Sequence, residues 1–158
     1  MKYCFTFLLL VALASCNTAK VKDRRLERDR EQLVKELSAM VEKDQNGRIQ
    51  LDKLRDDFGG TEVYAFKRDS LWTVQKTIDD ANIERLIAIT KKYGFPNVDR
   101  IKSPIPMWLI FQHTTPEYTE RVRELITKEH KAGRFPNNEF KIINWHLGGR
   151  NGPLPEIN

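Results

Sequence analysis

Seven polar side chains in the middle of the chain are of types that do acid–base chemistry or bind ligands. His113 is suited to act as a general base, with Asp79 or Asp44 to orient it. The guanidinium group of Arg48 and the amide groups of Asn82 and Gln112 are suited to stabilising negative charge that develops during a reaction. Together these residue types could support hydrolysis. The set consists of Asp44, Gln45, Arg48, Asp79, Asn82, Gln112 and His113.

Each of these residues also has an explanation that needs no function. Asp44 and Arg48 are four residues apart and can pair across a helix end. Asp79 can cap the helix that contains Asn82, because Asp accepts backbone N–H bonds there. His113 closes an apolar helix, at the end where a cation is favoured. The hydrolytic hypothesis therefore depends on whether His113 meets a carboxylate directly or through one water.

No standard catalytic or cofactor motif is present in the chain. The phosphate-binding, dinucleotide-binding, zinc-protease and serine-hydrolase patterns are all missing. The stretch 42–53 resembles a calcium loop, but Lys53 stands where a bidentate Glu is required. We therefore expect neither a metal nor another cofactor.

The N-terminus has the layout of a bacterial lipoprotein signal peptide. Lys2 is followed by an apolar run from Cys4 to Ala14, which is too short to span a bilayer as a helix. Residues 13–16 read Leu-Ala-Ser-Cys and match the lipobox, so Cys16 is the predicted lipidation site. Two or three acyl chains hold a protein on its membrane almost permanently. Asn17 is not the Asp of the inner-membrane retention signal, so in a Gram-negative cell the outer membrane, with the domain facing the periplasm, is the expected location.

The positive charge of the chain is concentrated next to this anchor. Residues 17–30 hold six Lys or Arg against three Asp or Glu, whereas residues 31–158 hold 20 against 19. A nucleic-acid-binding domain would carry its charge on the folded part, so nucleic acid is not an expected partner. Anionic lipid headgroups next to the anchor are a better match, although the segment could equally be a solvated, charged helix.

The hydrophobic spacing predicts a mainly α fold, a single compact bundle of five to seven helices behind a lipidated tether. The expected divisions are a signal peptide over 1–15, a basic tether over 16–30, a helical domain over 31–150 and an irregular tail over 151–158. The tryptophans lie on apolar faces and are expected in the core: Trp72, Trp108 and Trp145. Helical patterns cover 26–46, 51–57, 69–78, 83–94, 104–113, 115–133 and 136–147, whereas 61–67 could be extended.

The order of the short motifs resembles an uncharacterised family of bacterial lipoproteins with a domain of unknown function. The similarity covers about residues 33–150 and implies a small, mainly helical, often extracytoplasmic protein, without an established activity. The chain departs from the family where it has Asn144-Trp145-His146-Leu147 in place of an acidic–arginine pair, and where its tail lacks a Tyr-Gly. If the acidic residue belongs to a site, this chain is a diverged or impaired member. The motifs are Asp44-Gln45-x-x-Arg48, Trp72, Asp79-x-x-Asn82 with Leu86, Gly94-x-Pro96, and Gln112-His113.

Two hypotheses follow for the function. The favoured one is a membrane-anchored lipoprotein that acts as a binding or interaction module of the cell envelope, with an envelope protein or peptide as its partner. The alternative is an envelope hydrolase that uses His113 with Asp79 or Asp44. The bilayer, reached through the acyl groups on Cys16, is the other expected partner.

Overall fold

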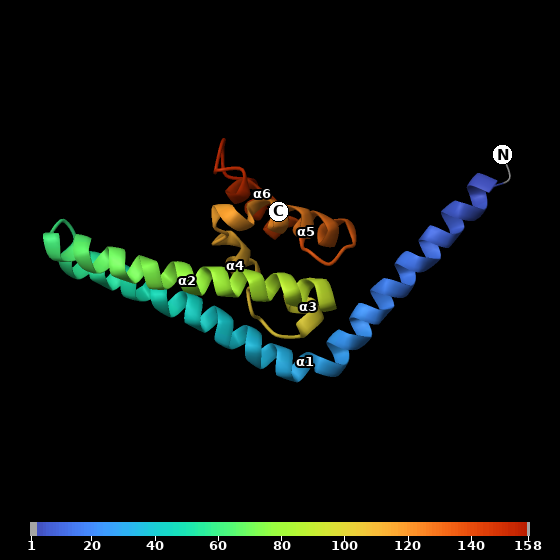
Figure 1. The fold of residues 1–158 in the computed structure, drawn as a ribbon, viewed down its shortest axis with the longest axis horizontal. Helices are drawn as coiled ribbons and strands as arrows, with labels where there is room; N and C mark the ends of the chain where they lie inside the picture. The colour runs from blue at the N-terminus through green and yellow to red at the C-terminus, as the bar shows by residue number, and fades with distance from the viewer. Residues whose placement is uncertain (1–2, 158) are drawn as a thin grey trace.

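The computed structural model describes the backbone of residues 3–157 and the side chains of residues 19–157. Six α-helices and one 3-10 turn are present in this part of the chain, without a strand, so the predicted mainly α bundle is confirmed. The two longest helices form an antiparallel hairpin, and the shorter ones pack against one half of it (Figure 1). The elements are α1 (Tyr3–Phe58), α2 (Glu62–Tyr93), α3 (Val98–Ile101), α4 (Trp108–Gln112), η1 (Pro116–Tyr118), α5 (Thr119–Lys131) and α6 (Asn137–Leu147).

The hairpin differs from the sequence-based expectation at two points. The helix predicted to end at Asn46-Gly47 continues through that dipeptide to Phe58. The segment 61–67, expected to be extended, is the first part of α2, because Thr61 caps it by accepting a hydrogen bond from the Tyr64 N–H at 3.1 Å. A single helix then runs without a break to Gly94, whose φ of 78° ends it as predicted.

The shorter helices follow the predicted order, with one shortened element. The pattern over 104–113 predicted a full helix, but only Trp108–Gln112 is helical. Pro104 and Pro106 explain the difference, because each lacks a backbone N–H and pushes the preceding residue out of the helical region. The predicted helices over 115–133 and 136–147 are present as η1 with α5 and as α6.

The core lies between the hairpin and α3 to α6 and includes Leu37, Ile83, Leu86, Phe111, Ile126 and Ile143. Trp108 is partly buried against this core. The expectation that Trp72 belongs to it is wrong, because 47% of its surface is exposed. The first part of α2, which contains Trp72, extends beyond the shorter helices, and there only the faces between α1 and α2 can be buried (Figure 1). We call this projecting part, residues 49–74, the arm.

The opposite end of the hairpin contains the segment next to the predicted anchor. Residues 19–30 belong to α1, and Leu26 is only 4% exposed. No helix in the described part of the chain has an apolar stretch long enough to cross a membrane. Cys16 lies outside the residues whose side chains are described, so the lipobox and the tether division stay predictions.

Candidate functional site

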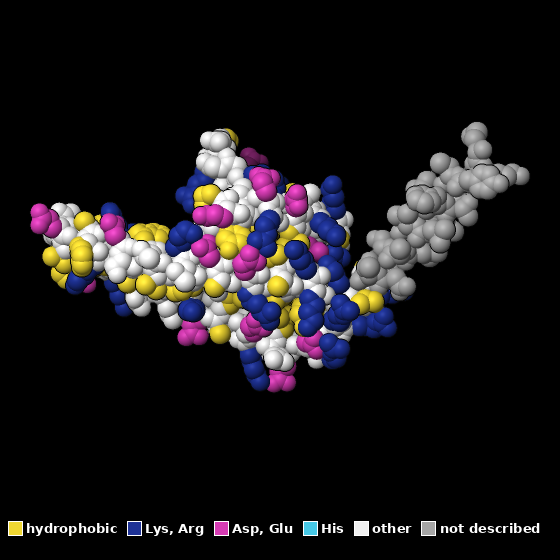
Figure 2. All heavy atoms as spheres, viewed as in Figure 1, with side chains coloured by type: hydrophobic (Ala, Val, Ile, Leu, Met, Phe, Trp, Pro, Cys, Tyr) yellow, Lys and Arg dark blue, Asp and Glu magenta, His cyan; other side chains and the backbone are white. Residues whose placement is uncertain are grey.

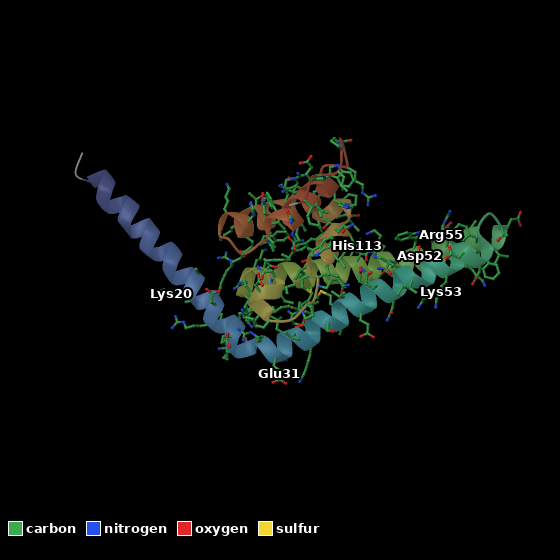
Figure 3. The ribbon with its side chains drawn as sticks, turned by 180° about the vertical axis from the view of Figure 1, so that it is seen from behind. Lys20, Glu31, Asp52, Lys53, Arg55 and His113 are labelled. Carbon is green, nitrogen blue, oxygen red and sulfur yellow. The ribbon has the colours of Figure 1, made fainter. Side chains whose placement is uncertain are left out.

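Five side chains from three helices meet where the arm joins the rest of the molecule. Asp44 and Arg48 lie one turn apart on α1, and Gln75 and Asp79 lie one turn apart on α2. His113 caps the C-terminus of α4 and faces the hairpin (Figure 3). We call these five residues the polar cluster.

Arg48 holds the two carboxylates of the cluster together. Its Nη2 donates to Oδ1 of Asp44 at 3.2 Å and to Oδ1 of Asp79 at 2.8 Å. Gln75 adds a hydrogen bond from Nε2 to the same oxygen of Asp79, also at 2.8 Å. The expected pairing of Asp44 with Arg48 is confirmed, but it lies inside a helix and not at its end, and Arg48 also bonds Asp79 on α2.

His113 meets Asp44 directly. Its Nδ1 lies 3.2 Å from Oδ1 of Asp44, a carboxylate that is 1% exposed. An ionised carboxylate only accepts hydrogen bonds, so Nδ1 carries a proton and donates a hydrogen bond to Asp44, and whenever the ring is uncharged Nε2 is an acceptor. Nε2 has no hydrogen-bond partner among residues 19–157, and 19% of the side chain is exposed. The contact that the hydrolytic hypothesis requires is therefore present.

The two carboxylates differ in their acidity. Burial raises the pKa of Asp44, but hydrogen bonds from His113 and Arg48 outweigh burial and lower this pKa to about 2. Burial also raises the pKa of Asp79, and there the contacts with Gln75 and Arg48 offset only part of the effect. Asp44 is thus the carboxylate that stays ionised beside His113.

The other three predicted residues lie beside the cluster, and only Gln45 contacts one of its side chains directly. Gln45 donates from Nε2 to Oδ2 of Asp44 at 2.6 Å, and Asn82 donates to the Met40 carbonyl at 3.4 Å, one helical turn from Asp44. The expectation that Asp79 caps a helix is wrong, because Asp79 and Asn82 both lie in the interior of α2.

Gln112 points to a neighbouring pocket of about 270 Å³, which it lines together with Thr114, His146 and Arg150. Burial lowers the pKa of His146, and the charges of Arg150 and His113 add to the effect. Nε of Arg150 donates to Nδ1 of His146 at 3.1 Å. A second imidazole therefore lies beside the cluster, in an uncharged state that can exchange hydrogen bonds with a ligand.

Sequence reasoning missed Gln75 and the role of Gly47. A Cβ at Gly47 would lie 1.9 Å from Oε1 of Gln75, so the glutamine would have to leave its present position if any other residue stood at 47. The signals were the helical spacing of Gln75 and Asp79, four residues apart, and a glycine within the motif that starts at Asp44. The sequence instead predicts a helix end at Asn46-Gly47.

The carboxylates and the imidazole also have the composition of a metal site. Single ligand atoms of Asp44, Asp79 and His113 lie within 4.8 Å of one another. The guanidinium of Arg48, however, already lies between the two carboxylates, forms an ion pair with each and would repel a cation there. The side chains as arranged therefore do not fit a cation. The calcium-like stretch 42–53 is helical within α1 and forms no loop.

The arm carries the other feature that requires an explanation. Six of the nine large hydrophobic side chains recorded as exposed between residues 19 and 157 are on it, and yellow side chains follow it in Figure 2. A groove of about 340 Å³ between α1 and α2 continues this surface at the base of the arm, with Leu71, Val74 and Ile78 on its α2 side. The six exposed residues are Ile49, Phe58, Val63, Phe66, Trp72 and Val74.

Comparison of the chain with family models, with curated proteins and with solved structures finds no match.

Proposed function

We propose that the protein is a membrane-anchored lipoprotein of the bacterial envelope whose helical domain binds a protein or peptide partner through the arm. The observation that carries this proposal is the concentration of exposed apolar side chains on residues 49–74. A helical hairpin of this kind leaves apolar surface in water unless something covers it, and such patches mark interaction sites.

The exposed residues on α2 form a stripe. Val63, Phe66 and Val74, with Ser70 between the last two, follow one another at intervals of three and four residues, so they share one face of the helix. Phe66 is 82% exposed. A stripe with this spacing suits a partner that offers an apolar groove or a second amphipathic helix.

The charge of the arm favours an apolar contact over an electrostatic one. Residues 49–74 contain four Lys or Arg and five Asp or Glu, and several of these pair with neighbours on the same helix, such as Arg55 with Asp52 at 2.9 Å. A strongly charged partner would find little to bind here. An envelope protein or peptide with an apolar surface is the partner that fits.

Site-specific photo-crosslinking in intact cells tests the proposal. A photoreactive residue at Phe66 should give a discrete adduct with another protein, whereas the same residue at Ala65, about 100° around the same helix, should not. Both positions are exposed. Equal yields from the two positions, no adduct from Phe66, or an adduct with the mass of two copies of this chain would contradict the proposal.

A second candidate function, envelope hydrolysis, is supported by the 3.2 Å contact between His113 and Asp44. In this mechanism Asp44 holds the ring so that Nε2 takes a proton from water as the water attacks the substrate, and the conjugate acid then protonates the leaving group. His146 and Arg150 in the adjoining pocket are placed to bind the substrate or its developing charge.

Hydrolysis of p-nitrophenyl esters by the purified protein is the probe for this second candidate. His113→Asn should abolish the activity, while Asp80→Asn, a substitution on α2 outside the cluster, should leave it unchanged. Turnover that survives His113→Asn, or no turnover by the unsubstituted protein, would remove the hydrolase from consideration and leave the binding function.

A further inference from the structure

The end of the domain opposite the arm is strongly basic, although residues 31–158 as a whole are almost neutral. Segments far apart in the sequence meet there: the start of the described side chains of α1, the C-terminal turn of α2 and the C-terminal turn of α5. We call this region the basic end. Figure 2 shows dark blue side chains crowding this side of the molecule.

One buried junction fixes the three segments together. Nζ of Lys22 on α1 donates to the Thr90 carbonyl of α2 at 3.4 Å and to Oε1 of Glu129 on α5 at 3.2 Å. Glu129 is fully buried and also accepts hydrogen bonds from Arg134 and from the Phe95 N–H. These buried contacts therefore hold the three segments of the basic end next to one another.

Six cations surround this junction without an ion pair among the described residues. Each lies within three residues of Lys22, Thr90 or Glu129, so their placement follows from the junction. Every one of them is exposed. The acids of the same region are already engaged, since Asp23 binds Arg100, Asp29 binds Arg28, and Glu129 binds Arg134. The six are Lys20, Arg24, Arg25, Lys91, Lys128 and Lys131.

We propose that the basic end docks against the anionic phospholipid headgroups of the membrane that carries the lipid anchor, and so turns the arm away from the bilayer. The inference rests on the proposed anchor at Cys16, which is four residues before Lys20. Figure 3 places Lys20 at this end and Lys53 on the arm, at the other end of the hairpin. Cations next to a membrane surface are attracted by its negative potential, and here α2 and α5 extend the tether's cations into one surface.

The test uses the full mature protein with its acyl groups, reconstituted in phosphatidylcholine vesicles with or without phosphatidylglycerol. Lipidation consumes Cys16, and Cys4 is removed with the signal peptide, so one introduced cysteine gives a unique labelling position. A fluorophore at Thr127→Cys on α5 should be quenched by spin-labelled headgroups much more strongly when phosphatidylglycerol is present. The same fluorophore at Asp52→Cys on the arm should show little quenching in either membrane.

Charge reversal supplies the matched control. Lys128→Glu with Lys131→Glu should abolish the additional quenching at Thr127→Cys, while Lys53→Glu with Arg55→Glu should leave it unchanged. High salt should abolish the additional quenching at Thr127→Cys without any charge reversal. This arm keeps the test valid even if a charge-reversed variant unfolds. Quenching that is equal in both membranes, or unaffected by salt, would overturn the docking proposal. A mature protein without acyl groups would show that the anchor itself is wrong, a separate result seen in its mass.

Discussion

Oδ1 of Asp44 lies 3.2 Å from Nδ1 of His113, although 69 residues separate the two in the chain. The contact connects the middle of α1 to the end of α4 and places a buried, ionised carboxylate behind a partly exposed imidazole. Arg48 shares the same carboxylate oxygen and connects it to Asp79 on α2. The polar cluster thus joins three helices at the base of the arm.

The opposite pKa directions of the two carboxylates predict opposite effects of neutralising them. The folded-state pKa of Asp44, about 2, is below its ordinary value, so Asp44 contributes stability above about pH 4 that is lost as the pH falls toward 2. Asp44→Asn should lower the free energy of unfolding at neutral pH by about 2 kcal/mol. Urea unfolding at neutral pH and at about pH 3 measures this, because the difference should shrink at the lower pH.

Asp79→Asn is the matched comparison. Burial raises the pKa of Asp79, so its charged form is disfavoured at neutral pH, and that cost decreases as the pH falls. An amide removes the cost and still accepts the hydrogen bonds from Arg48 and Gln75. We expect a change below about 1 kcal/mol in the free energy of unfolding, in either direction. A larger loss for Asp79→Asn than for Asp44→Asn would refute this assignment of the two carboxylates.

Gly47→Ala tests the close approach of α1 and α2 beside the cluster. Alanine in place of glycine inside a helix normally stabilises it by about 1 kcal/mol. Here the new Cβ would lie 1.9 Å from Oε1 of Gln75 and would displace that side chain from Asp79. The substitution should therefore lower the melting temperature in the natural sequence and raise it in a Gln75→Ala background. The same sign in both backgrounds would show that Gln75 is not the obstacle.

Substitutions at Glu129 and Glu120, both on α5, should differ strongly in their effect on stability. Its carboxylate is fully buried and bonds Lys22, Arg134 and the Phe95 N–H, so Glu129→Ala leaves buried charge and a buried donor without a partner. A loss of about 3–5 kcal/mol in the free energy of unfolding is expected. Glu120→Ala, which removes an exposed ion pair with Arg123 at 3.6 Å, should cost well below about 1 kcal/mol. Chemical unfolding measures both losses. A loss for Glu129→Ala as small as that for Glu120→Ala would mean that the junction is solvated and not buried.

Two tryptophans should respond differently to truncation. Trp72 on the arm is exposed, whereas Trp108 packs against the core. Trp72→Ala should leave the melting temperature almost unchanged, and Trp108→Ala should cost about 2 kcal/mol or more in stability. Thermal unfolding followed by circular dichroism compares them. A comparable loss for Trp72→Ala would mean that another part of the same chain packs over Trp72 and buries it.

The sequence predicted the fold class well because long amphipathic patterns depend only on local spacing. It also identified four members of the polar cluster, since Asp44, Arg48, Asp79 and His113 were singled out by residue type. It failed where the outcome depends on tertiary packing. Asn46-Gly47 predicts a helix end, since nothing in the sequence shows that Gln75 approaches this glycine.

The arm could not be predicted for a related reason. An apolar residue at helical spacing indicates a buried face only if a neighbouring element is there to cover it, and the hairpin is longer than the helices packed against it. Trp72 therefore looked like a core residue in the sequence and is exposed in the structure. The same circumstance makes the arm the best candidate for a binding surface.

One measurement tests the binding proposal most directly. A photoreactive residue at Val63 reports contact with the partner in intact cells, while Phe66→Asp places a charge on the same stripe without touching the core. Because Phe66 is 82% exposed, the melting temperature should not change. The proposal predicts a partner adduct from Val63 that disappears when Phe66→Asp is added. An adduct that persists at full yield in the folded variant would contradict a function that depends on this surface.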